Sequence, residues 1–423
     1  MTGPPFGFGS GADGPGSGDD RDPSSGKQPA RSGGGFGIPE DIASKVPLFA
    51  ELQKLMSWQG GPVNWDLARQ TAISQVAGGH VPVSAAERRA VEDAVRLADL
   101  WLDPVTTLPS GVRQVEAWSR VEWIEKTLPV WSQLCDPIAS RVVSAMSTAL
   151  PEQAQQLAGP MMGLLGQFGG MMFGAQVGQG MSSLAGEVLS STDVGLPLAP
   201  PGTAVLLPQN VAAFGGGLER PADEVRLFLA LREAAHQRLF GHVPWLRQRL
   251  LDTVDAYARG IHVDSDAINE AMLAVDPGNP ESIQQALGGG MFQPQDTPEQ
   301  KLALARLETL LALVEGWVDH VVALATEGRL PGAVALRETI RRRRASGGPA
   351  EQTFATLVGL ELRPRRLREA SQLWSLLAEQ RDSAGRDALW AQVDLLPTSE
   401  DLDDPRGFVD RDDTQGPSMA DLT

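Results

Sequence analysis

The stretch Leu231-Arg232-Glu233-Ala234-Ala235-His236 lies inside the run of residues 225–240. It matches the pattern H-E-x-x-H at every position except the first, where arginine replaces histidine. In a complete H-E-x-x-H helix, two histidines one turn apart bind zinc, and the glutamate is general base for the metal-bound water. The stretch therefore predicts a helix with Glu233 as candidate base and His236 as candidate metal ligand. It leaves open whether the metal site works, was rebuilt or was lost.

Bulk properties exclude several classes of protein. The chain has 423 residues, 42 % of them hydrophobic, which is enough for a sizeable core. A net charge of −17 argues against a general nucleic-acid binder. The single cysteine, Cys135, excludes an internal disulfide and is compatible with a reducing compartment. The N-terminus has no basic segment followed by an apolar run, so we expect no signal peptide and a cytoplasmic location.

Composition changes at both ends of the chain. Residues 1–37 are mostly Gly, Pro, Ser and Asp, and they have too little aliphatic surface to offset the entropy of ordering. Residues 399–423 are acidic. We expect both ends to be disordered. Between them we expect an N-terminal helical region over 38–150 and a second domain over 151–398.

The pattern between the two ends is mainly helical. Helical spacing with turn signals between the segments covers residues 39–60, 64–78, 84–102, 110–126 and 128–149. At the start of the third segment, Ser84 fits an N-cap and Glu87 fits its capping-box partner. The fold class is therefore predicted to be mainly α.

One segment favours β structure. Two short apolar runs, 202–207 and 210–214, are separated by Pro208. They fit either two strands of a small sheet or one strand followed by the start of a helix. We therefore expect at most a small β element near residues 203–214.

Residues 153–186 carry no formal charge, and small residues recur along them every four positions. These are Gly166, Gly170, Gly174, Gly178, Ser182 and Gly186. The pattern fits either a membrane helix with G-x-x-x-G packing or a buried, tightly packed central helix. Six glutamines between 153 and 179 and the absence of flanking Lys/Arg clusters favour the buried helix. We therefore expect no membrane span.

Arg232 and His236 are four residues apart, so they share a helix face. A charge in an apolar helical stretch needs a partner, because an unpaired buried charge is strongly unfavourable. Residues 297–328 are the best source of one. Thr297 as N-cap and Gln300 as its capping-box partner predict the start of a helix there.

This second helix carries two acids within an apolar stripe. Glu315 lies among aliphatic residues, where a carboxylate is out of place, and Gly316 allows another helix to come close. Asp319 follows one turn later. The spacing suits a metal ligand, Glu315, and an acid that orients a ligand, Asp319.

With these segments the chain resembles a family of zincin-like metallopeptidases of actinobacteria, also described as zinc-dependent metalloproteases or hydrolases. The resemblance covers roughly residues 155–400. It rests on GGMMFGAQVG at 169–178, LREAAH at 231–236, VPWLR at 243–247 and LVEGWVD at 313–319, and GGPAEQTF at 347–354 is also similar. It implies a zincin-like domain and zinc-dependent peptide hydrolysis. It assigns His236 and Glu315 as metal ligands, Glu233 as base and Asp319 as a supporting acid.

Arg232 stands at the first ligand position of that family, so zinc is a possible cofactor but is not assured. His242 lies six residues after His236, the spacing of a third metzincin ligand, and is a weak further ligand candidate. Alternatively, the Arg232 guanidinium pairs with Glu315 or Glu233, replaces the metal and repels a dication. A third reading is a coincidental motif in a purely structural helix pair.

Two functions therefore remain open. One is a metal-dependent peptidase with a degenerate R-E-x-x-H site, active or inactive. The other is a non-catalytic pseudoenzyme that binds a peptide or protein segment. The run Arg341 to Arg344 lacks interleaved aromatics, so it does not support nucleic-acid binding. We expect it to form a solvated helix face, and an alternative is a clasp with the acidic tail. The sequence carries no signal for an oligomeric state.

Overall fold

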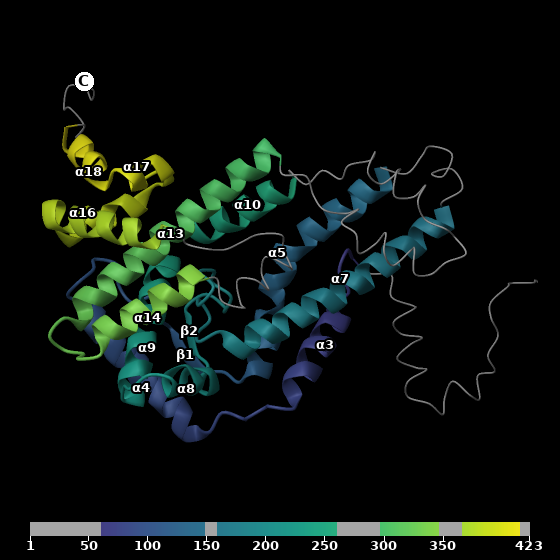
Figure 1. Ribbon diagram of the computed structural model, residues 1–423, viewed down its shortest axis with the longest axis horizontal. Helices are drawn as coiled ribbons and strands as arrows, with labels where there is room; N and C mark the ends of the chain where they lie inside the picture. Colours follow the sequence, from purple (N-terminus) through teal and green to yellow (C-terminus); the bar gives the residue numbers. More distant parts are fainter. Residues whose placement is uncertain (1–60, 149–158, 260–296, 347–365, 415–423) are drawn as a thin grey trace, which may run out of the picture. The chain divides into compact units, whose positions relative to one another are not determined.

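The computed structural model describes residues 61–148, 159–259, 297–346 and 366–414 (Figure 1). These residues are mainly helical, as the sequence predicted. They fall into one compact unit. The segments 1–37, 39–60 and 347–354, for which the sequence carried predictions, lie outside the described residues.

Helices from both sides of the expected boundary at 150/151 pack together. Helix α3 (Trp65–Ala77) lies along α7 (Gly159–Glu187), and α4 (Ala85–Leu102) lies against α9 (Ala222–His242). The predicted capping box at the start of α4 is present, with Ser84 and Glu87 each bonding to the backbone of the other. The N-terminal helices therefore contribute directly to the packing around α9.

A two-stranded parallel sheet joins distant parts of the chain. Strand β1 (Gln114–Ala117) pairs with β2 (Thr203–Leu206) from Gln114↔Thr203 to Ala117↔Leu206. Helix α8 (Pro208–Gly216) follows β2, so the alternative of one strand and a helix start is confirmed. The expected helix over 110–126 is wrong in its first half, because β1 occupies 114–117 and α5 (Arg120–Thr148) begins only at Arg120. The buried backbone of β2 needs a hydrogen-bonding neighbour, and β1 supplies it.

Two glycines of the small-residue ridge on α7, Gly174 and Gly178, have the packing role expected of a buried helix. A Cβ atom on Gly174 would lie 2.5 Å from the carbonyl oxygen of Asn64, and one on Gly178 would lie 2.5 Å from that of Ala68. Both oxygens belong to the beginning of α3 or its cap. Glycine at these positions lets the two backbones approach, which a larger side chain would prevent.

The long helix α13 (Pro298–Thr326) runs through the core. It begins with the predicted capping box of Thr297 and Gln300. It packs against α9, α10 (Leu246–Arg259), α14 (Ala333–Ser346) and α16 (Leu367–Ala388). Among the described residues it is the one helix long and apolar enough to cross a membrane, and 83 % of its apolar window is buried inside the protein. Such burial is typical of a core helix.

The acidic end of the chain is helical as far as the structure describes it. After two short 3-10 turns, η1 (Leu389–Ala391) and η2 (Val393–Leu395), the chain forms α17 (Ser399–Asp403) and α18 (Pro405–Thr414). The prediction of disorder from residue 399 is therefore wrong for 399–414. A capping box between Thr398 and Asp401 starts α17, and Leu402 and Val409 are buried against the core. Residues 415–423 lie outside the described residues.

Candidate functional site

The R-E-x-x-H stretch lies in the buried middle of α9. Arg232 is 9 % exposed, Glu233 0 % and His236 2 %. The helix begins after Pro221, and Asp223 and Glu224 in its first turn complement the helix dipole. Three polar side chains are thus buried within two turns, and each needs a partner from another element.

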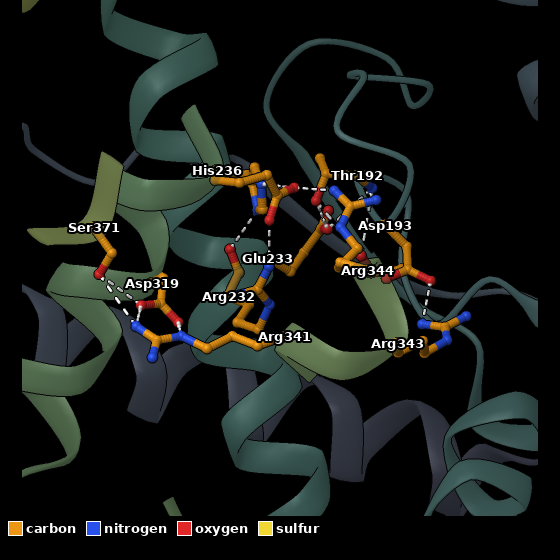
Figure 2. A network of polar contacts seen from close by, with 12 residues as sticks. Thr192, Asp193, Arg232, Glu233, His236, Asp319, Arg341, Arg343, Arg344 and Ser371 are labelled. Carbon is orange, nitrogen blue, oxygen red and sulfur yellow. Dashed lines mark hydrogen bonds and ion pairs between the residues drawn. The ribbon is translucent and has the colours of Figure 1, made fainter. Parts of the chain in front are cut away.

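The carboxylate of Glu315 is the centre of the site. It is fully buried on α13. Arg232 donates from Nη2 to Oε2 of Glu315 over 2.6 Å, and Nε2 of His236 lies 3.2 Å from Oε1. Arg344 of α14 forms a further ion pair with Oε1 (Figure 2). The structure therefore brings Arg232, His236 and Glu315 together, as the sequence suggested, and adds Arg344.

Charge keeps Glu315 ionised in this buried position. Burial alone would raise its pKa, but the nearby charges of Arg344 and Arg232 and the contact with His236 outweigh burial. Together they hold the pKa of Glu315 well below its usual range. Because Nδ1 of His236 lies 2.8 Å from the carbonyl oxygen of Arg232, both ring nitrogens face oxygen acceptors.

Sequence reasoning missed the part played by the arginine run on α14. The expected solvated face is wrong for three of its four members. Arg341 binds Asp319, Arg343 binds Asp193 and the carbonyl of Glu187, and Arg344 binds Glu315, while Arg342 pairs with Glu338 at the surface. The available signal was the spacing: Arg337, Arg341 and Arg344 repeat at i, i+4 and i+7, so they share one helix face.

The suggested clasp between the arginine run and the acidic tail is not what the described tail forms. Asp401 pairs with Arg411 inside the tail itself, and Asp403 pairs with Arg366 at the start of α16, with 2.5 Å between Oδ1 and Nη2. The arginine run instead finds its carboxylates on α13, on α14 itself and in the loop after α7.

Asp319 binds two arginines and a serine. Its Oδ2 accepts from Nε of Arg337 over 2.9 Å and from Oγ of Ser371 over 2.7 Å, and its Oδ1 accepts from Nε of Arg341 over 3.2 Å. Burial would raise its pKa, but the hydrogen bonds from both arginines outweigh it and lower that pKa. Asp319 therefore connects α13 with α14 and α16.

The carboxylate of Glu233 is engaged with other elements. Its Oε1 accepts from Oγ of Ser191 over 2.5 Å and from the backbone N–H of Val205 over 3.2 Å. Its Oε2 accepts from Oγ1 of Thr192 over 2.6 Å and from the backbone N–H of Thr192 over 3.3 Å, and Gln237 donates to Oε1 over 3.1 Å. A carboxylate offers about four lone-pair sites, and these donors use them. In Figure 2 the side chain points toward Thr192.

Two of these partners, Ser191 and Thr192, were not singled out from the sequence. The signal was a polar run of Ser190, Ser191, Thr192 and Asp193 directly after the uncharged helix. Ser190, Ser191 and Thr192 are buried, and Asp193 is partly buried. Ser191 and Thr192 of this run donate hydrogen bonds to Glu233 of the motif helix.

His242 does not join the other candidate ligands. It is exposed at the end of α9, and its Nδ1 lies 3.1 Å from the carbonyl oxygen of Arg238. Among the residues that the structure describes, no group of three or more His, Cys, Asp or Glu side chains is placed to hold a metal ion.

The residues present do not fit zinc. A catalytic zinc ion takes three protein ligands, each unprotonated at the binding atom, and an open fourth position. Here two guanidinium groups, of Arg232 and Arg344, bind the carboxylate that would have to be a ligand. Arginine cannot lose its proton near neutral pH, so a dication at Glu315 would meet two fixed positive charges.

The helical fold with a buried R-E-x-x-H helix defines a zincin-like protein. The family model described as zincin-like metallopeptidase matches residues 63–409, and the chain belongs to this family. The match begins at residue 63, well before the point at 155 where the resemblance was first placed, so the helices α3 and α4 are part of the family domain.

Among solved structures, a chain from Chloroflexus aurantiacus has the same fold. It is described as a candidate hydrolase with a novel fold. Its TM-score is 0.60 at 21 % sequence identity, and the match covers 84 % of this chain and 100 % of that chain. No curated protein matches the chain.

Proposed function

We propose that this protein is a zincin-like pseudoenzyme that binds a peptide or protein segment without cleaving it. The observation that supports the proposal is that Arg232 and Arg344 both bind Glu315, at the point where the resemblance would place zinc. Zinc-dependent hydrolysis is the second candidate. Membership of the family and the description of the Chloroflexus aurantiacus structure favour it.

The electrostatics favour the metal-free proposal. A zinc ion between α9 and α13 would bring two positive charges to a buried carboxylate. The guanidinium groups of Arg232 and Arg344 together bring the same formal charge as a zinc ion. Arg344 also connects α14 with α13. Arginine suits such a role because its charge is permanent and its planar group matches a carboxylate.

The surroundings of Glu233 agree with a structural role. A general base needs a free lone pair within hydrogen-bonding distance of the proton it takes. Donors from Ser191, Thr192, Val205 and Gln237 already use the Glu233 carboxylate. In this proposal Glu233 joins α9 to β2 and to the loop after α7.

Metal content tests the proposal. The wild type, Arg232→His and the double variant Arg232→His/Arg344→Gln would be purified without chelator or a metal-binding tag, and zinc measured by mass spectrometry. We expect no bound zinc in the wild type and little in the single variant, because Arg344 still binds Glu315. The double variant has three possible protein ligands, and we expect it to bind about one zinc ion per chain.

The matched control is Arg232→His/Arg342→Gln. Arg342 lies on the same helix but pairs with Glu338 at the surface, so this control should stay as zinc-poor as the single variant. About one zinc ion per wild-type chain, together with peptide cleavage that a chelator abolishes, would overturn the proposal and restore the hydrolase.

A further inference from the structure

We infer that the bound partner presents a carboxylate, which the guanidinium of Arg232 recognises; this rests on the proposed binding function. Arg232 is nine-tenths buried, and its Nη2 donates to Glu315. In the parts of the chain that the structure describes, no residue accepts a hydrogen bond from its Nε or Nη1. Two donor positions of this side chain are therefore open to an acceptor from outside the described chain.

Both positions are within reach of a ligand. The Arg232 side chain retains 10 % of its exposure, and neither Nε nor Nη1 is among the fully buried nitrogens that lack a partner. By contrast, Nε of Arg238 on the same helix is fully buried without a partner, and that side chain is only 1 % exposed. Arg232 is thus the arginine of α9 that combines deep burial with accessible, unused donors.

The charge around Arg232 favours an anion. Glu315 and Asp319 on α13 each bind two arginines, Arg232 and Arg344 in one case and Arg337 and Arg341 in the other. When Glu233 is added to Glu315 and Asp319, the four arginines still outnumber the three carboxylates. The chain as a whole carries −17, so this local excess of positive charge opposes the overall balance. Arg337 and Arg341 are 30 % and 20 % exposed, so the excess reaches the surface.

A carboxylate suits this site better than a point anion. A guanidinium has two edges with parallel N–H groups, Nε–Nη2 and Nη1–Nη2, and each edge matches the two oxygens of a carboxylate. Glu315 uses one hydrogen of Nη2 at Arg232, so the second hydrogen of Nη2 and its neighbour on the other edge can bind a further carboxylate. In a peptide or protein segment, that group is an Asp or Glu side chain or the C-terminal carboxylate. Both sources share the same chemistry, and the experiment separates them.

The probes are three pools of fluorescently labelled nonapeptides with random uncharged residues around a fixed centre. The first pool has a central Asp and an amidated end, the second a central Asn and a free C-terminal carboxylate, and the third a central Asn and an amidated end. Binding to the full-length protein is measured by fluorescence anisotropy. We expect the first or second pool to bind at least about tenfold more tightly than the third.

Variants then assign the contact. Arg232→Gln removes the charge and the guanidinium but keeps a polar side chain, and we expect it to lose the preference for a carboxylate. Arg232→Lys keeps the positive charge but lacks the planar guanidinium, and we expect it to bind the carboxylate pools more weakly than the wild type. This variant replaces Arg232→Gln in the experiment if the glutamine variant does not fold. Arg342→Gln removes an exposed arginine of α14, and we expect wild-type binding.

Equal binding of all three pools, no binding of any pool, or wild-type binding by Arg232→Gln would overturn the inference. Mass spectrometry of the recovered peptides keeps the two proposals apart. Cleavage of a carboxylate-bearing pool by the wild type would refute the pseudoenzyme, yet leave recognition of the carboxylate by Arg232 in place.

Discussion

Nη2 of Arg232 on α9 lies 2.6 Å from Oε2 of Glu315 on α13, although 83 residues separate them in the chain. The same carboxylate binds Arg344 of α14 and contacts His236 of α9. One fully buried carboxylate therefore holds three helices together. Removing it would leave buried cations without a counter-ion, which is far less favourable than losing an ion pair at the surface.

We expect Glu315→Gln to lower the free energy of unfolding by roughly 3–5 kcal/mol, because Arg232 and Arg344 would remain buried without a full negative charge. Urea denaturation, monitored by circular dichroism, measures the free energy of unfolding of the variant and of the wild type. The control is Glu338→Gln. Glu338 also binds two arginines, Arg342 and Arg368, but at the surface, so that variant should unfold close to the wild type. Equal effects of the two changes would contradict the role given to Glu315.

Glu233→Gln separates a structural acceptor from a catalytic base. The carboxylate accepts from Ser191, Thr192, Val205 and Gln237, and an amide turns one acceptor into a donor facing donors. We expect a loss of roughly 1–3 kcal/mol in the free energy of unfolding. If Glu233 were the catalytic base of an open site, Glu233→Gln would abolish turnover and leave the free energy of unfolding unchanged. Urea denaturation and a peptide-cleavage assay distinguish the two outcomes.

The contact between α13 and α16 depends on Gly316. A Cβ atom there would lie 2.6 Å from Cβ of Ala370 and 2.8 Å from the backbone nitrogen of Ser371. We expect Gly316→Ala to destabilise the protein by roughly 1–3 kcal/mol, because backbone atoms must move. In Gly186→Ala the new Cβ meets nothing within 4 Å, so a neutral or slightly stabilising change is expected. Thermal unfolding of the two variants side by side checks the contrast.

His320 should make stability depend on pH. Burial, followed by the charges of Arg386 and Arg337, lowers its pKa from 6.5 to about 4. Between these values the unfolded chain binds the proton and the folded chain does not, so the contribution is fully present above pH 6.5 and decreases as pH falls toward 4. The expected loss across this window is about 3 kcal/mol.

His320→Phe removes this titration. Nε2 of His320 is buried and has no hydrogen-bond partner among the described residues, so an apolar ring should be tolerated. We expect the variant to show a shallower loss of stability than the wild type between pH 6.5 and about 4, and a parallel curve above pH 7. If the free energy of unfolding falls equally steeply with pH in the wild type and in His320→Phe, His320 is not the source of the pH dependence.

Local interactions made much of the helical structure predictable. The capping boxes at Ser84 and Thr297 are formed as expected, because each involves residues only three positions apart. The four-residue spacing of Arg232 and His236 put both on one face of α9, and an acid within the apolar stripe at Glu315 marked their partner. Helix periodicity and the need to neutralise a buried charge were sufficient for these predictions.

Contacts between distant segments were not predictable in the same way. Strand β1 exists because Gln114 to Ala117 pair with β2, and nothing inside the segment itself favours a strand over a helix. Helices α17 and α18 were expected to be disordered from their charge, yet Leu402 and Val409 find a buried surface. In both cases a partner far away in the chain outweighs the local preference.

The sequence by itself determined that a charged R-E-x-x-H helix is buried and that Arg232 needs a carboxylate. Only the tertiary structure decided which groups pair with these charges. Helix α14 brings Arg344 to Glu315, and β2 and the loop after α7 donate hydrogen bonds to Glu233. The reason is physical. Periodicity fixes which face of its own helix a side chain occupies, whereas the partner of a long arginine or a buried carboxylate depends on which helix packs against that face.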